Sequence, residues 1–81
     1  MSVEELEKKL LYNGWSYSYV QSLILWKRGV ALFYLQKKNS KNPVLLFKDE
    51  CYPCSDIVSL SFTTQWLLIK WKDGRRWFLE Y

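Results

Sequence analysis

Apolar positions change their spacing after the first dozen residues, which predicts a helix followed by strands. Leu6 and Leu10 recur at helical spacing, and early glutamates followed by lysines suit the helix dipole. Ser2-Val3-Glu4-Glu5 has the form of a capping box, and Asn13-Gly14 provides a left-handed stop. The sequence therefore predicts one helix over about residues 2–13.

Beyond the helix, apolar and polar residues alternate with the period of two that is typical of strands. Lys27-Arg28-Gly29 fits a three-residue hairpin loop, and the polar stretch 37–43 and the Pro-containing stretch 49–56 are predicted connections. Later in the chain, Val58 is expected on the same apolar side as Leu60. The predicted strands are 15–26, 30–37, 43–48, 57–63, 65–72 and 75–81.

The last two strands predict a hairpin whose register follows from its turn. A two-residue Asp73-Gly74 loop would place Glu80 opposite Leu67, among apolar residues. A three-residue loop that begins at Lys72 pairs Leu67 with Leu79 instead, and is therefore expected. That register gathers Leu67, Ile69, Trp71, Trp77, Leu79 and Tyr81 on one face, and Trp66, Leu68, Lys70, Arg76, Phe78 and Glu80 on the other.

Together these elements predict an α+β fold, with one short N-terminal helix packed on a twisted antiparallel sheet of five or six strands. The strands would form hairpins or a meander that could curl toward a barrel. A chain of 81 residues has room for one core, so residues 1–81 are expected to form a single domain. The hairpin at 23–35 is apolar on both faces near its turn, and the helix, the sheet or a second subunit would cover them.

The composition narrows the class of protein. No apolar run is long enough to span a membrane, and the N-terminus lacks the basic and apolar regions of a signal peptide, so we expect a soluble cytoplasmic protein. Twelve basic and eight acidic residues give a net charge of +4, and because three of the acids precede Lys8, the rest of the chain carries +7. A protein with this charge would attract polyanions. A surface whose charge serves only to keep the protein in solution would have the same composition.

Cys51-Tyr52-Pro53-Cys54 is the one recognisable short motif. Redox chemistry would require the pair at a helix N-terminus, whereas strand-like residues follow it and Asp49 and Glu50 add negative charge. Zinc requires four ligands, and without histidine the chain supplies only two thiolates, so a site would have to be shared across a dimer. A structural loop, with Cys51 and Cys54 reduced or bridged to each other as a disulfide, is favoured over a redox-active pair and over a shared zinc site.

Catalysis is not expected, because the residues it requires are absent or scattered. The chain has no histidine to act as a general base, and its acids are distributed over the helix, the turns and the C-terminal segment. Its three glycines are isolated and form no phosphate-binding loop. The sequence thus predicts a protein that is not an enzyme and uses no cofactor, metal or small-molecule substrate.

Basic residues beside aromatic ones are the remaining functional signal. Five Trp, six Tyr and four Phe exceed what a small core easily encloses, so some rings are expected on the surface. Exposed rings and cations on a sheet would bind nucleic acid, although solvated hairpin tips with protective lysines give the same pattern. The candidate residues are Lys70, Lys72, Arg75, Arg76, Trp66, Phe78, Lys37, Lys38 and Lys41.

A protein partner is the competing hypothesis. Exposed Trp, Tyr and Arg side chains are typical of interaction hot spots, and the hairpin at 23–35 would serve as the interface of a homodimer. In that case the protein would act by occupying its partner.

Two segments resemble known families. The helix that ends in Asn13-Gly14-Trp15 resembles the start of HicA-type toxins, but those depend on a histidine that this chain lacks, so RNA cleavage is not implied. The segment 57–81, with its Asp73-Gly74-Arg75 turn, resembles small β-meander domains of bacterial proteins. The small size and the richness in Trp, Tyr and Lys are similar to those of orphan proteins of phages and archaeal viruses.

Overall fold

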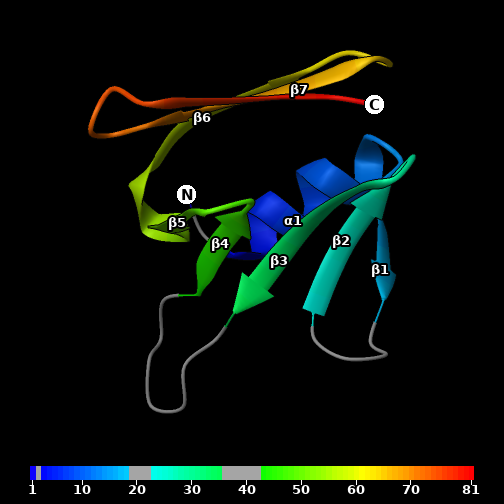
Figure 1. Ribbon diagram of the computed structural model, residues 1–81, viewed down its shortest axis with the longest axis horizontal. Coiled ribbons are helices and arrows are strands. Elements are labelled where there is room, and N and C mark those ends of the chain that lie inside the picture. The colour runs from blue at the N-terminus through cyan, green and yellow to red at the C-terminus, as the bar shows by residue number, and fades with distance from the viewer. Residues whose placement is uncertain (2, 19–22, 36–42) are drawn as a thin grey trace.

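The computed structural model describes residues 1, 3–18, 23–35 and 43–81, and the described strands form two antiparallel sheets (Figure 1). The larger sheet consists, in order, of β1 (Ser16–Ser18), β2 (Leu23–Lys27), β3 (Val30–Leu35), β4 (Val44–Phe47) and β5 (Glu50–Pro53). The smaller sheet consists of β6 (Ile57–Phe62), β7 (Trp66–Trp71) and β8 (Arg76–Glu80). The α+β arrangement is confirmed, but the strands are divided between two sheets, and neither is closed into a barrel.

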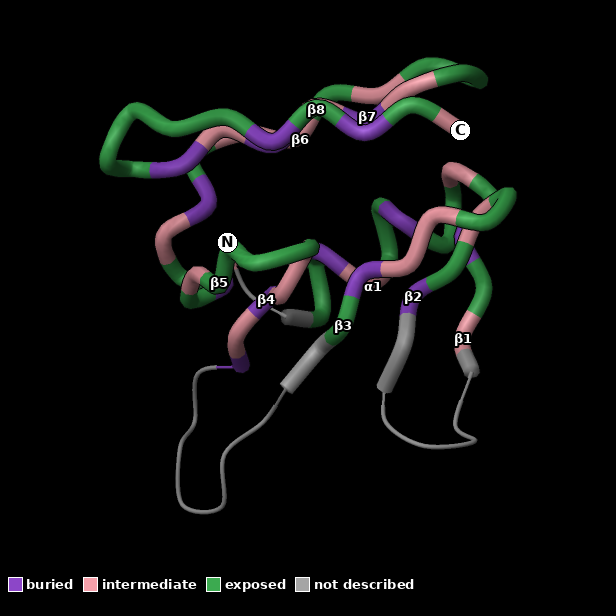
Figure 2. Tube along the Cα trace, viewed as in Figure 1, coloured by how far each residue is buried: buried purple, intermediate pink, exposed green. Residues whose placement is uncertain are grey.

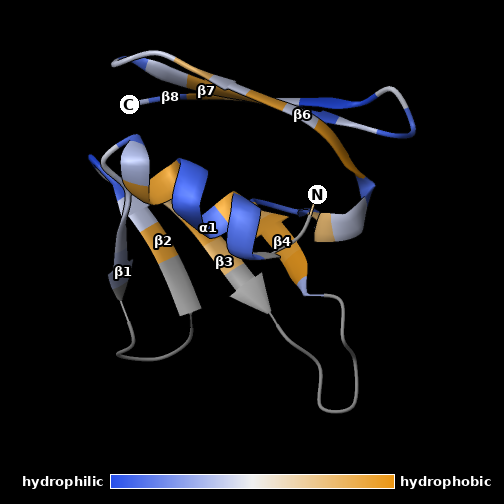
Figure 3. Ribbon diagram, turned by 180° about the vertical axis from the view of Figure 1, so that it is seen from behind, coloured by the Kyte–Doolittle hydropathy of each residue, from blue (hydrophilic) through white to orange (hydrophobic). Residues whose placement is uncertain are grey.

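The N-terminal helix α1 (Val3–Tyr12) lies against one face of the five-stranded sheet (Figure 3). Leu6 and Leu10, the apolar residues that predicted the helix, are fully buried. The helix ends as expected: Gly14 adopts a φ of 87°, and the Trp15 N–H donates to the Leu10 carbonyl oxygen at 3.0 Å. The capping residue Ser2 lies outside the described residues.

The prediction of one strand over residues 15–26 is wrong. β1 and β2 are separate strands that pair antiparallel, with Tyr17 opposite Leu25. Both strands of a hairpin carry the same period of two, so the alternation along this stretch did not reveal the reversal between them. The connection, residues 19–22, lies outside the described part of the chain.

The β2–β3 loop has two residues, not the predicted three. Lys27 pairs with Val30, while Arg28 and Gly29 adopt φ angles of 48° and 85°, as a type I′ turn requires. The shorter loop places Leu25 opposite Leu32, and both side chains are fully buried. Burial of apolar residues on the side of the sheet that α1 covers therefore accounts for the register.

β5 lies within the stretch 49–56 that was predicted to be a connection. It pairs with β4 through a two-residue turn, with Phe47 opposite Glu50. Pro53 indicated a break, but β5 is an edge strand, where a residue without an N–H is tolerated. The short 3-10 helix η1 (Cys54–Asp56) then leads into the second sheet.

Val58 lies on the exposed side of β6, contrary to the predicted alternation, and is 61% exposed. A β-bulge explains the difference, because Ile57 pairs with Trp71 whereas Ser59 pairs with the preceding residue, Lys70. The extra residue shifts the phase of the strand by one position. Ile57 is therefore buried in place of Val58.

The last hairpin has the predicted register. Leu67 pairs with Leu79, and the Gly74 N–H donates to the Trp71 carbonyl oxygen at 3.0 Å, which closes the three-residue loop. Figure 2 shows buried residues alternating with intermediate ones along β7 and with exposed ones along β8. The expected inner face is confirmed: Leu67, Ile69, Trp71, Trp77 and Leu79 are buried, and Tyr81 packs against them.

Four rings, named here the inter-sheet aromatic cluster, join the two sheets: Phe47, Tyr52, Trp71 and Trp77. Tyr52 of β5 stacks on Trp71 of β7 with centroids 4.9 Å apart, and lies 5.4 Å from the ring of Trp77. Phe47 of β4 contacts Trp77 at 6.2 Å. Large rings bury much apolar surface, so this cluster holds the inner face of β7 and β8 against the five-stranded sheet.

Tyr81, directly after β8, joins the three-stranded sheet to the end of α1. Its ring meets Trp15 edge-on at 5.7 Å, and its hydroxyl accepts a hydrogen bond from Asn13 Nδ2 at 2.7 Å. The same hydroxyl donates to the Trp66 carbonyl oxygen at 3.1 Å. One phenol thus connects the end of α1 to the start of β7.

We expect Tyr81→Phe to lower the free energy of unfolding by about 1–2 kcal/mol, because it removes these hydrogen bonds and keeps the ring. Urea unfolding followed by tryptophan fluorescence measures the change. Tyr12→Phe is the matched control, since Tyr12 is 87% exposed and its hydroxyl should contribute little. Equal stabilities of the two variants would show that the Tyr81 hydroxyl does not connect the elements.

Candidate nucleic-acid interface

The outer face of the three-stranded sheet is the surface opposite the buried side chains of β7 and β8. Its residues alternate with the buried ones and pair with each other across the strands. Its members are Ser59, Ser61, Trp66, Leu68, Lys70, Arg76, Phe78 and Glu80. The residues that the β7–β8 hairpin contributes to this face are those expected from the sequence, and the pairing register places them on one side of the sheet.

Two of these residues form an aromatic pair at the surface. The rings of Trp66 and Phe78 lie 5.7 Å apart and come from diagonal positions on neighbouring strands. Phe78 is 54% exposed, and Trp66 is half-buried. A flat apolar partner, such as an unpaired base, could stack on rings presented in this way.

Two cations lie directly opposite each other on the same face. Lys70 of β7 is the cross-strand partner of Arg76 of β8, and neither makes an ion pair with another described residue. Like charges at directly opposed positions destabilise a sheet. An anion placed between them would remove this repulsion and gain from both charges.

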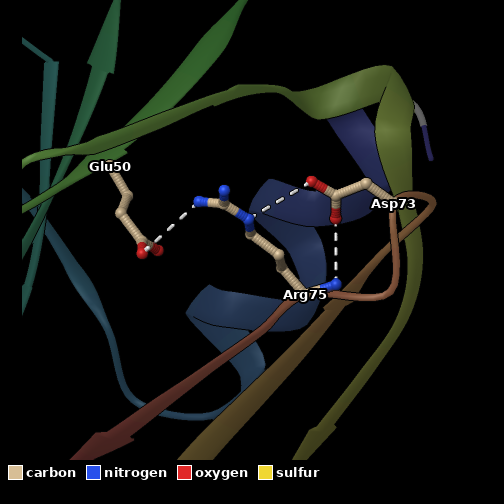
Figure 4. A network of polar contacts seen from close by, with 3 residues as sticks. All are labelled: Glu50, Asp73 and Arg75. Carbon is tan, nitrogen blue, oxygen red and sulfur yellow. Dashed lines mark hydrogen bonds and ion pairs between the residues drawn. The ribbon is translucent and has the colours of Figure 1, made fainter.

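Arg75 does not belong to this face, although it was a candidate. Its guanidinium lies 3.9 Å from a carboxylate oxygen of Glu50 in β5 and 3.7 Å from one of Asp73, as Figure 4 shows. It also lies 5.8 Å from the centroid of the Tyr52 ring. Arg75 therefore caps the inter-sheet aromatic cluster.

The other candidate lysines are not assembled with the outer face. Lys72 is exposed at the tip of the β7–β8 turn, where its N–H donates to the Asp56 carbonyl oxygen at 2.9 Å. Lys37, Lys38 and Lys41 lie outside the described residues. Of the nine candidates, four thus share one surface: Trp66, Lys70, Arg76 and Phe78.

The two cysteines occupy different environments. Cys51 is an exposed free thiol in β5, whereas Cys54 is a free thiol with only 1% of its surface exposed. Burial raises the pKa of Cys54 to about 12, so it remains protonated near neutral pH. Thiolates are the reactive and metal-binding form, so this environment favours a structural role for Cys54. In the described parts of the chain, no group of three or more His, Cys, Asp or Glu residues could hold a metal.

A second exposed apolar surface lies on the five-stranded sheet. Trp26 and Phe33 are exposed, and the pairing places them on the face opposite the buried Leu25 and Leu32. Leu46, paired with Phe33, extends this surface. The sequence predicted that the hairpin is apolar on both faces, and the structure shows one of them exposed.

A cleft that the sequence did not indicate separates β8 from the β4–β5 turn. It has a volume of about 330 Å³ and is lined by Phe47, Lys48, Asp49, Glu50, Arg76, Trp77 and Phe78. These residues come from two sheets, and no local pattern predicts how separate sheets approach each other. The cleft leaves space beside the first half of β8.

Comparisons with protein-family models, with curated proteins and with solved structures find no match to this chain. Among the described residues, no helix has the length and apolar character needed to cross a membrane.

We expect iodoacetamide at pH 8 to modify Cys51 and to leave Cys54 unmodified in the folded protein. Cys54 is both inaccessible and protonated at that pH, whereas Cys51 is exposed. Mass spectrometry of the Cys51→Ser and Cys54→Ser variants counts the labelled thiols separately. Cys54 should become reactive on unfolding in urea, and fast labelling without urea would contradict its burial.

Proposed function

We propose that this protein binds single-stranded nucleic acid on the outer face of the three-stranded sheet, as a non-catalytic binding module. The observation that supports the proposal most strongly is the opposed pair of Lys70 and Arg76 beside the rings of Trp66 and Phe78. Cations that make no ion pair with another described residue can bind phosphates, and adjacent rings can stack on bases.

The shape of the surface favours single strands over a duplex. Trp66 and Phe78 lie on a sheet, and their rings can stack only on bases whose faces are free. A duplex keeps those faces inside its stack. No pattern for reading particular bases is evident on the outer face, so we propose binding that depends little on sequence.

The spacing of the residues is consistent with a short binding site. Lys70 is two residues from Leu68 and four from Trp66 along β7, so the cations and the rings occupy successive positions on one face. A strand laid across them would place phosphates near the cations and bases near the rings. Glu80, opposite Trp66, would limit the site at the other end by repelling phosphate.

Fluorescence anisotropy with labelled oligonucleotides tests the proposal. We expect stronger binding to single strands than to a duplex, and an affinity that falls linearly with salt concentration on logarithmic axes. Lys70→Ala should reduce the magnitude of the salt slope by about 0.7, the value for one phosphate contact on a single strand. Trp66→Leu should weaken binding by about fivefold or more, because one stacked base is lost.

Matched controls separate this site from general charge attraction. Lys9→Ala removes an equal charge from the exposed side of α1, and Tyr12→Leu removes an exposed ring. Neither should change the affinity at physiological salt by more than about twofold. Absence of binding at low salt, or an equal loss for Lys9→Ala and Lys70→Ala, would refute the outer-face site.

A second candidate function, a protein-interaction module, is favoured by the exposed Trp26 and Phe33 on the five-stranded sheet. Aromatic residues at such positions are enriched in protein interfaces. Absence of nucleic-acid binding, together with self-association that Trp26→Ser abolishes, would support this alternative.

A further inference from the structure

The outer edge of β8 carries backbone groups that pair with no described segment. β8 is the last strand of its sheet. The Trp71 N–H donates to the Arg75 carbonyl oxygen at 2.9 Å, and the Tyr81 N–H donates to that of Gln65 at 3.0 Å. In an antiparallel ladder, alternate residues bond to the same neighbour. The odd-numbered residues of this segment therefore bond toward β7.

It follows that Arg76, Phe78 and Glu80 direct their N–H and carbonyl groups away from β7. Among the described residues, none of these groups bonds to the backbone of another segment. The cleft lined by Arg76 and Phe78 shows that the β4–β5 turn leaves space beside this edge. An exposed row of unpaired groups is a template for one more strand.

The side chains along this edge are complementary to a second copy of themselves. A two-fold axis perpendicular to the sheet at Phe78 would make two β8 strands antiparallel, with Phe78 opposite its own copy. Arg76 of each chain would then face Glu80 of the other. All of these positions are ones whose backbone groups point outward, so each pair would exchange two hydrogen bonds.

Other registers lack this match. If the partner strand is moved along β8 by two residues, Arg76 lies opposite Phe78 and has no acidic partner. If the two-fold axis passes through Arg76 or through Glu80, that residue lies opposite its own copy, so like charges face each other. A shift by one residue places residues whose N–H and carbonyl groups point away from β7 opposite residues whose groups point toward β7, so the hydrogen bonds cannot form. Opposite charges on both sides of a central aromatic pair therefore select one arrangement.

We infer that this protein forms a symmetric homodimer in which two β8 strands pair antiparallel about Phe78, making one six-stranded sheet from two three-stranded ones. Such an interface is isologous, because each chain contributes the same patch. The inference does not depend on nucleic-acid binding. If both hold, the dimer presents two outer faces side by side on a continuous sheet, and Lys70 is the main phosphate contact of each face because Arg76 faces Glu80 of the other chain.

Charge reversal tests the register. Sedimentation velocity over a concentration series should show a monomer–dimer equilibrium for the wild type. Arg76→Glu places acids opposite acids, and Glu80→Arg places bases opposite bases, so each variant alone should dissociate at least tenfold more readily. An equimolar mixture of the two should restore the dimer, because every opposed pair then has opposite charges. The double variant should also restore it.

Lys9→Glu is the matched control, since it reverses an exposed charge on α1 and should leave association unchanged. Phe78→Lys places two cations at the two-fold axis and should give a monomer. Thermal unfolding of each variant checks that the exposed substitutions leave the fold intact.

A wild-type protein that remains monomeric at millimolar concentration would overturn the inference. A dimer that persists in Arg76→Glu, or a mixture that fails to associate, would show that a different surface is used. Lys70→Ala and Trp66→Leu lie on the central strand β7, away from this edge, so their effect on oligonucleotide binding is measured independently.

Discussion

The packing of two sheets through the inter-sheet aromatic cluster determines the rest of this structure. A three-stranded sheet alone would have two exposed faces and little buried surface. Because Tyr52 and Phe47 pack on Trp71 and Trp77, one face of that sheet is buried and the other is directed outward. The proposed interface and the outer edge of β8 are both defined by this packing.

The parts of the fold that follow from local chemistry could be predicted from the sequence. Gly14 ended the helix where expected, and the final hairpin had a register that only one loop length made compatible with a buried face. The errors arose where one residue changed the phase or the direction of a strand. The bulge beside Val58 and the two-residue turn at Arg28 both depend on packing against elements distant in sequence.

The candidate site was predictable to the same extent. Alternation along β7 and β8 places Lys70 and Arg76 on one face, and the structure agrees. Adjacent residues of a strand point to opposite faces, which explains why Arg75, next to Arg76, is directed toward Glu50 of β5 and away from the outer face. The cleft, and the lack of a described segment paired with the edge of β8, could not be predicted, because they depend on how two sheets approach each other.

In both sheets, every strand pairs with its neighbour in sequence. Each hairpin therefore closes a short loop, whose entropic cost is small, and only the docking of the finished sheets joins distant parts of the chain. Short-range pairing of this kind is associated with rapid folding for an all-antiparallel arrangement. We expect the hairpins to form first and the aromatic residues to be enclosed last. The chain therefore exposes its aromatic residues to solvent until the two sheets dock.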